Sequence, residues 1–219
     1  MNGSGPEDAD ARQKDRFRDV VTGVFGLVLA LSAFSVTTAD YESTDAVWRA
    51  LSLYTPAFFF VLAIWRISGE LFDRYPADDR LFYILITLVL FLTTLAPAFL
   101  NLFLDEEPSV QRLSGTLFPV AMAAIFALLT ALWLRLRTLS TRRGRPPDAD
   151  LTGNALVAGA LAALFLASLL APFHPGDHSP RTLAWFAAFV LPGALLRLRR
   201  RAGRARPPRA GEPLTARGP

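Results

Sequence analysis

Six apolar segments run along the chain, separated by short polar stretches that hold nearly all of the charge. Each is 15 to 24 residues long, and Arg49 is the only Asp, Glu, Lys or Arg within them. A helix that faced water would need a polar side, so uncharged segments of about 20 residues predict helices that cross a bilayer. The segments are residues 20–36, 46–65, 81–104, 113–134, 151–173 and 182–196. The predicted fold class is all-α, a polytopic membrane protein with six transmembrane helices.

Basic residues alternate in number from one side of the predicted helices to the other. The amino-terminal stretch, the second and fourth connections and the carboxy-terminal tail would share one side, and they hold 20 of the 23 Lys and Arg residues. The opposite side holds only Arg49, Arg112 and Arg181, beside several carboxylates. Because Lys and Arg accumulate in cytoplasmic loops, both termini are predicted to be cytoplasmic.

The first segment and the two ends of the chain need separate treatment. A cleaved secretory signal is an alternative for residues 20–36, since basic residues precede them and Thr37-Thr38-Ala39 would serve as a cleavage site. Its 17 apolar residues exceed the usual signal core, so we favour a retained helix. Residues 1–13 and 202–219 lack an apolar period and are expected to be disordered cytoplasmic tails around a membrane domain at residues 14–201.

Several kinds of chemistry are missing from the sequence. The chain has no cysteine, which excludes disulfides, thiolate metal sites and cysteine nucleophiles. It also lacks a phosphate-binding glycine loop, a His-Glu-x-x-His motif and a Gly-x-Ser-x-Gly motif. No carboxylate lies within an apolar segment, whereas proton-coupled transporters generally need an ionisable group there. We therefore expect neither an enzyme nor an active transporter, and neither catalytic residues nor a cofactor.

The two histidines share one predicted external connection. His174 and His178 flank Asp177, and a metal site or a weak response to external acidity are two interpretations. Three side chains are too few to complete a metal site, and Pro175 and Gly176 oppose a helix that would align them. A polar turn without metal is the favoured interpretation.

The arginines of the carboxy-terminal tail allow more than one partner. The run from Arg197 to Arg209 could contact anionic lipid headgroups. A basic run that directly follows a span is also explained as a cytoplasmic anchor, which we favour. Nucleic acid is not an expected partner, because no aromatic residue is interleaved with these arginines.

Small residues recur every fourth position in the predicted fifth helix. They are Ala155, Gly159, Ala163, Ala167 and Ala171. Such a row makes a smooth helix face that a second helix can approach closely. The second helix could belong to the same subunit or to another one.

The first segment carries both a stripe and a motif. Leu27, Ala30, Leu31 and Phe34 are spaced to share one helical face. The stretch from Arg16 to Leu31 resembles the first helix of the transmembrane protein 175 family of potassium channels. Its signature is Arg, three residues, Phe-Ser-Asp, a small residue and Val-Phe before an aliphatic run. Arg16, Gly23, Val24 and Phe25 match it, whereas Val20, Val21 and Thr22 stand where Phe, Ser and Asp would be.

The resemblance continues into the second and third segments. It runs through the aromatic-rich residues 54–65, which end in Trp65, to Leu71-Phe72, with Ser68 and Gly69 at the positions of a histidine pair. Asp79-Arg80-Leu81 and Pro97 also fit the family pattern. The likeness covers residues 16–103 and is only topological beyond them. It implies a six-helix subunit with cytoplasmic termini in the cell membrane.

The resemblance also implies a site and an activity. Prokaryotic members assemble as tetramers whose first helices line the pore with rings of bulky aliphatic side chains. By position, Leu27, Leu31 and Phe34 would form such rings, with Ala30 at a place often held by threonine. A pore of this kind gates by dewetting and has no carbonyl filter. Our leading hypothesis is a passive homotetrameric channel for potassium or other monovalent cations, embedded in membrane lipids, with Arg16 bracing the cytoplasmic end of the first helix.

Two rival hypotheses remain open. Loss of the Phe-Ser-Asp element favours a non-conducting membrane protein of the same fold that binds partners or organises lipids. A small facilitator for an uncharged solute is the other rival. Oligomeric state separates the first rival from the channel, and solute flux without ionic current would identify the second.

Overall fold

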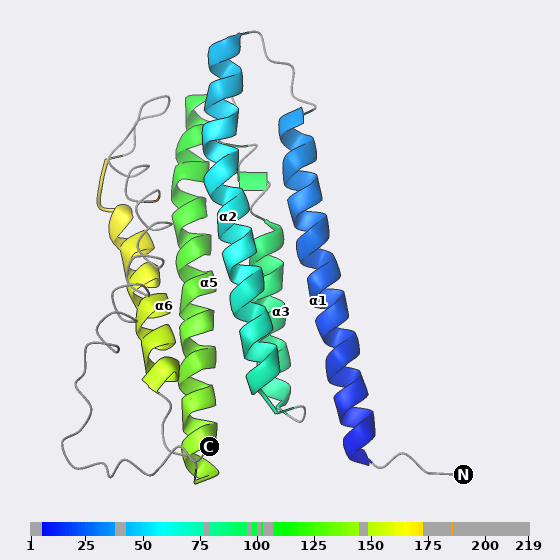
Figure 1. The fold of residues 1–219 in the computed structure, drawn as a ribbon. Helices are drawn as coiled ribbons and strands as arrows, with labels where there is room; N and C mark the ends of the chain where they lie inside the picture. The colour runs from blue at the N-terminus through cyan, green and yellow to red at the C-terminus, as the bar shows by residue number, and fades with distance from the viewer. Residues whose placement is uncertain are drawn as a thin grey trace, which may run out of the picture.

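The chain folds into a bundle of helices, drawn in Figure 1. This computed structural model describes residues 6–37, 43–76, 79–95, 98–99, 102, 107–144, 149–172 and 185. The described part is all-helical, with five helices and no strand: α1 (Pro6–Thr37), α2 (Thr44–Arg74), α3 (Arg80–Thr94), α5 (Pro108–Arg142) and α6 (Ala149–Ser168). Three stretches within them are long and apolar enough to cross a membrane, at Arg12–Phe34, Pro108–Arg142 and Asp150–Ser168, and α3 is a shorter apolar helix.

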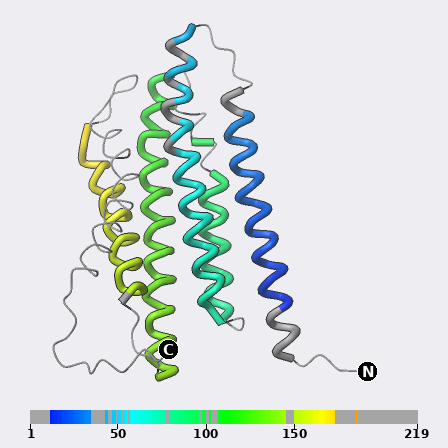
Figure 2. Tube along the Cα trace, in the orientation of Figure 1, coloured from blue at the N-terminus to red at the C-terminus, as the bar shows by residue number. Residues whose placement is uncertain are grey.

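The helices lie side by side, with α5 in the interior of the bundle. In Figure 1 and Figure 2, α6 flanks α5 on one side, α2 and α3 lie on the other, and α1 stands at the far edge. α5 packs against α6, α3 and α2, whereas α1 packs against α2 and α3. One face of α1 thus packs against α2 and α3 of its own subunit, and the opposite face lies on the outside of the bundle.

The first helix begins earlier than the sequence predicted. Residues 1–13 were expected to be disordered, yet α1 already begins at Pro6. Proline suits the first turn of a helix, and Ala9, Ala11 and Arg12 are strong helix formers, so the helix extends beyond the apolar segment toward the amino terminus. The other predicted tail, residues 202–219, lies outside the described residues.

The third helix is shorter than the predicted segment 81–104. α3 ends at Thr94, and Leu95 caps it through its N–H to the carbonyls of Leu92 and Thr93. Pro97 follows closely, and a proline both lacks an N–H and disfavours helical geometry at the residue before it. Residues 98–99 and 102 are helical again, and the Phe99 N–H donates to the Leu95 carbonyl at 3.1 Å, so α3 itself ends early while part of the remaining predicted segment is helical.

Most of the predicted sixth segment lies outside the described residues, but Trp185 lies within them. Its indole N–H donates to the Ser168 hydroxyl at 3.0 Å. Its ring centroid lies 5.0 Å from that of Phe118. Trp185 therefore packs against the end of α6 and against α5.

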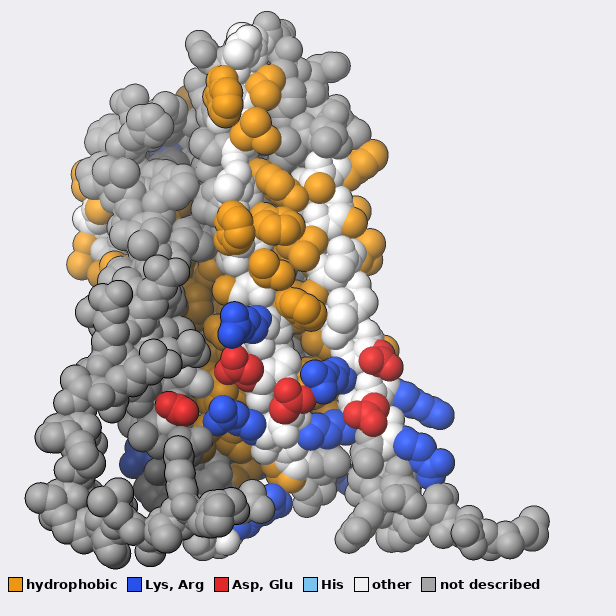
Figure 3. Space-filling view, viewed as in Figure 1, with side chains coloured by type: hydrophobic (Ala, Val, Ile, Leu, Met, Phe, Trp, Pro, Cys, Tyr) orange, Lys and Arg blue, Asp and Glu red, His pale blue; other side chains and the backbone are white. Residues whose placement is uncertain are grey.

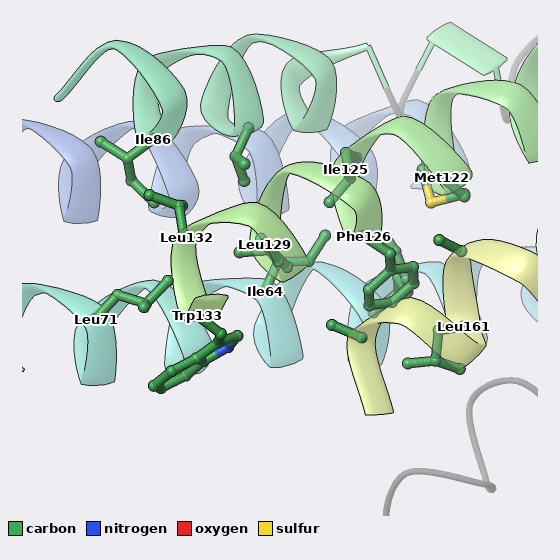
Figure 4. Close-up of a cluster of buried hydrophobic side chains, with 14 of the residues drawn as sticks. Ile64, Leu71, Ile86, Met122, Ile125, Phe126, Leu129, Leu132, Trp133 and Leu161 are labelled. Carbon is green, nitrogen blue, oxygen red and sulfur yellow. The ribbon is translucent and has the colours of Figure 1, made fainter. Parts of the chain in front are cut away.

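The core is organised around α5, as Figure 4 shows. Leu129 of α5 and Ile64 of α2 are both completely buried. The ring of Phe126 on α5 stacks on Phe165 of α6 with centroids 5.9 Å apart. The same ring meets Phe60 of α2 edge to face at 5.3 Å. The rings of Phe60 and Phe165 also lie 6.2 Å apart, so one aromatic cluster joins α2, α5 and α6.

The small residues of α6 are only partly used inside the subunit. Ala155 is buried, and a Cβ at Gly159 would stand 3.7 Å from the Thr130 methyl group of α5. Ala163 and Ala167 are exposed. The α5–α6 contact therefore uses the first half of the predicted row, because Leu161, Ala162 and Phe165 turn toward the core farther along α6.

Two buried serines provide a matched test of hydrogen bonding in this core. The Ser68 hydroxyl is buried and has no hydrogen-bond partner among the described residues, whereas Ser114 donates to the carbonyl of Phe99 at 2.9 Å. We expect Ser68→Ala to leave the free energy of unfolding unchanged or raise it by about 1 kcal/mol, and Ser114→Ala to lower it by about 1 kcal/mol. Unfolding in mixed detergent micelles measures both, and a larger loss for Ser68→Ala would contradict the assignment.

Candidate functional site

The four residues that the resemblance places at the gate share the outward face of α1. Leu27, Leu31 and Phe34 have exposed fractions of 57%, 50% and 63%, and Ala30 is also exposed. Apolar side chains on other helices are exposed to a similar extent, for example Phe59 of α2 at 57% and Ile84 of α3 at 58%. In a membrane such a face contacts either lipid or another helix.

The outward face forms a straight stripe whose members alternate three and four residues apart. They are Val20, Gly23, Leu27, Ala30 and Phe34. A spacing that averages 3.5 residues is the repeat that keeps one seam facing a neighbouring parallel helix. A Cβ added at Gly23 or Gly26 would meet nothing within 4 Å, so the described residues leave room for a second backbone on this face.

The opposite face of α1 is packed into the core. Val21, Phe25 and Val28 are each only 2% exposed. Nearer the amino terminus, the ring of Phe17 lies 5.1 Å from Tyr83 of α3. Phe25 of the motif therefore anchors α1 to its own subunit.

The remaining motif residues divide between these two faces. Arg16, Thr22 and Gly23 are exposed, and Val24 is half-buried. Trp65 of α2 has an exposed fraction of 41%. The structure thus brings together the gate residues, Arg16 and Gly23 on one surface, and places Phe25 and Trp65 elsewhere.

The amino-terminal part of α1 is tied to the end of α2 by polar contacts. The Lys14 ammonium donates to the carbonyl of Tyr75 at 2.8 Å. The Arg18 guanidinium pairs with Asp73 at 2.8 Å. Arg16 makes neither a hydrogen bond nor an ion pair with any described residue and points outward. The contacts that brace this end of α1 within the subunit therefore come from Lys14 and Arg18.

A buried ion pair joins α3 to α5 at the same end of the bundle. Asp79, whose side chain is only 5% exposed, receives two hydrogen bonds of 2.9 Å from the Arg135 guanidinium. Asp79 is also the N-cap of α3, where it accepts from the N–H groups of Leu81 and Phe82. One carboxylate thereby starts α3 and fixes it to α5.

Tyr75 lies beside this pair and strengthens the junction. Its hydroxyl donates to the carbonyl of Leu132 on α5, and its ring stacks on Phe82 of α3 with centroids 4.3 Å apart. Burial raises the pKa of the Tyr75 hydroxyl and the Asp79 charge adds to this effect, so the group stays protonated as a donor. Because Lys14 holds the Tyr75 carbonyl, this residue links α1 to α5.

The ionisation of Asp79 follows from its surroundings. Burial alone would raise the pKa of this carboxyl, but the Arg135 hydrogen bonds, with the N–H groups of Phe82 and Leu81, outweigh burial and hold the pKa below its usual value. Asp79 is therefore ionised at neutral pH. Its charge is compensated by Arg135, so the pair contributes structure and carries no proton in the physiological range.

Because the pKa of Asp79 is depressed in the folded state, the contribution of this residue to the free energy of unfolding depends on pH. The contribution is fully present above the pKa of the unfolded carboxyl, about 4, and is lost as pH falls through the lower folded value. We expect wild type to be more stable than Asp79→Asn at pH 6, and the difference to shrink below about pH 4. Unfolding of both proteins between pH 6 and pH 2 measures this, and a constant difference would contradict it.

Most of the described charges gather near one end of the bundle, and Glu107 and Arg112 lie at the other end. Figure 3 shows Lys, Arg, Asp and Glu side chains over the lower part of α1 and α2, below a surface that is mostly apolar. The charged residues of α1 with described side chains end at Asp19, and none follows before the end of the helix at Thr37. The outward stripe therefore begins where the charged part of α1 ends.

The polar contacts between α1 and the end of α2, and the ion pair of Asp79 with Arg135, were not predicted from the sequence. Lys14, Arg18 and Arg135 were counted only as charges that set orientation. Asp79 directly before an apolar segment is a helix N-cap signal. Its partner lies 56 residues away on α5, a distance over which helical periodicity predicts nothing.

Comparison with known proteins assigns no family and no relative to the chain. No family model, curated protein or solved structure matches the chain. Among the described residues no group of three His, Cys, Asp or Glu side chains could hold a metal ion. His174, Asp177 and His178, and the arginines from Arg197 to Arg209, lie outside the described residues.

Proposed function

We propose that this chain is the subunit of a passive cation channel, permeable to potassium, in which four copies of α1 surround the pore. The observation that carries the proposal is the outward stripe of α1. Leu27, Leu31 and Phe34 are apolar, at least half exposed and aligned on one face. They are also the positions at which the resemblance to the transmembrane protein 175 family implies a gate.

The proposed channel has six spans and cytoplasmic termini in the cell membrane. The long apolar helices support a membrane location. The contacts of Trp185 with Ser168 and Phe118 are those expected if the sixth segment returns to the bundle. The arginine-rich end, with Arg66, Arg80 and Arg137, would face the cytoplasm by the positive-inside rule.

The chemistry of the stripe favours a hydrophobic gate. From Val20 to Thr37, α1 offers no charged side chain that could bind and release a coupling ion. A ring of leucine side chains narrows the pore and resists wetting, so ions cross only when the ring widens or hydrates. Transport through such a pore runs down the ion gradient.

A non-conducting interaction protein is the second candidate. Its support is the loss of polar residues from the motif, where Val21 is buried in the core and Thr22 stands in place of an acid. Such a protein would place the stripe against lipid or an unlike helix. It would be monomeric or dimeric in native mass spectrometry, whereas the channel requires a tetramer.

Reconstitution in liposomes tests the proposed function directly. Vesicles loaded with potassium are diluted into a potassium-free medium with a proton carrier, and potassium efflux is followed by a pH-sensitive dye. The channel predicts efflux above that of protein-free vesicles. Absence of efflux, or flux of an uncharged solute without ionic current, would contradict it.

A further inference from the structure

The amino-terminal part of α1 carries charges on two different faces. Lys14 and Arg18 face α2 and are satisfied there by the Tyr75 carbonyl and the Asp73 carboxylate. Asp15, Arg16 and Asp19 are exposed on the outside of the bundle, and none forms an ion pair with a described residue. The subunit thus satisfies its inward charges and leaves outward charges of both signs without an ion pair among the described residues.

The outward charges continue the apolar stripe in an ordered way. Arg16 lies four residues before Val20 and extends the stripe by one turn. Asp15 and Asp19 are four residues apart and form a column of their own on the helix surface. At 3.6 residues per turn this acidic column lies about 60 to 100° to one side of Arg16. A positive and a negative surface therefore stand side by side at one level of the helix.

This arrangement has a consequence in a ring of parallel helices. Each helix in a closed ring presents opposite flanks to its two neighbours, so the long side chain of Arg16, which starts on the central stripe, must extend to one flank to meet the acidic column of the next helix. We propose that the acidic column of Asp15 and Asp19 in one subunit receives Arg16 of the next subunit, which forms a ring of ion pairs at the charged end of the pore. This inference rests on the proposed function and names the contact that would hold its subunits in register.

The mixed signs identify a second copy of this chain as the partner. An anionic lipid surface binds a purely basic helix face best, and Asp15 and Asp19 weaken that attraction here. A copy of the same helix supplies both signs at the same height. Pairing also neutralises Arg16, which would otherwise form a positive ring that disfavours cations at the pore mouth.

Exchange of the two charges tests the contact. We expect Arg16→Asp and Asp19→Arg each to lower the association constant of the tetramer about tenfold at low ionic strength. The double variant Arg16→Asp with Asp19→Arg should return within about threefold of wild type, because the exchange restores opposite signs. Native mass spectrometry on dilution measures the tetramer fraction. Salt above about 0.5 M should reduce the differences among these proteins.

A control substitution on α5 distinguishes a failure of the ion-pair ring from a failure of the proposed channel. Arg137→Asp makes the same charge change on an exposed residue of α5 at the same end of the bundle, and should leave the tetramer fraction unchanged. A wild-type tetramer that the single variants do not weaken, or that the double variant fails to recover, would overturn the ion-pair ring alone. A wild-type chain that forms no tetramer would overturn the proposed function together with the ring.

Discussion

Replacing Leu27 or Leu31 with alanine is expected to raise the resting potassium flux of reconstituted vesicles by about tenfold. Each substitution removes three carbons from every copy of α1, so a fourfold ring becomes wider and easier to hydrate. A barrier lowered by about 1.4 kcal/mol corresponds to a tenfold faster rate. Both leucines are at least half exposed in the subunit, so the substitutions leave its core intact.

Leu88 provides the matched control for this prediction. It lies on α3, a shorter apolar helix, and is 44% exposed. Leu88→Ala removes the same atoms from a surface that the proposed channel turns toward lipid, and should leave the flux unchanged. An equal effect of Leu88→Ala and Leu27→Ala, or no effect of Leu27→Ala and Leu31→Ala, would contradict a gate on α1.

Replacing Arg135 with methionine is expected to lower the free energy of unfolding by about 3 kcal/mol. The substitution leaves the buried Asp79 carboxylate without its cation, and breaking one partner from a buried pair costs about 3 to 5 kcal/mol. The lower figure applies because the Arg135 side chain is itself 37% exposed. Unfolding in mixed micelles at neutral pH measures the loss.

Three companion variants define the cause of that loss. Arg137→Met removes an exposed arginine two residues along the same helix and should change stability by less than about 0.5 kcal/mol. Arg135→Lys keeps the positive charge but cannot make both hydrogen bonds to Asp79. Its loss of free energy of unfolding should lie between those of Arg137→Met and Arg135→Met. Adding Asp79→Asn to Arg135→Met should recover part of the loss, because no buried charge then remains. Equal losses for Arg135→Met and Arg137→Met would show that the pair is unimportant.

Local sequence patterns predicted much of the helical fold. Uncharged segments of about 20 residues correctly indicated all-helical structure, and each of the first five falls at least partly on a described helix. The spacing of Leu27, Ala30, Leu31 and Phe34 predicted that they share a face, and their common exposure agrees with this. These features depend on neighbours within four residues, which is the range that helical periodicity reports.

Features that depend on distant partners were not predicted. The carbonyl that Lys14 binds and the carboxylate that Arg135 binds lie 61 and 56 residues away. The small residues of α6 were read as one continuous row, whereas the contact with α5 follows only its first half. Composition also failed to mark Pro6 as the start of α1, because a polar helix resembles a disordered tail in composition alone.

Cross-linking through one introduced cysteine tests most directly whether α1 helices meet around an axis. The chain contains no cysteine, so Leu27→Cys, Leu88→Cys on α3 and Leu156→Cys on α6 each report a single position. All three leucines are exposed in the subunit. A short thiol cross-linker applied in membranes should join Leu27→Cys subunits into covalent dimers and leave the other two variants monomeric. Cross-linking of Leu88→Cys or Leu156→Cys, with none at Leu27→Cys, would contradict a pore lined by α1.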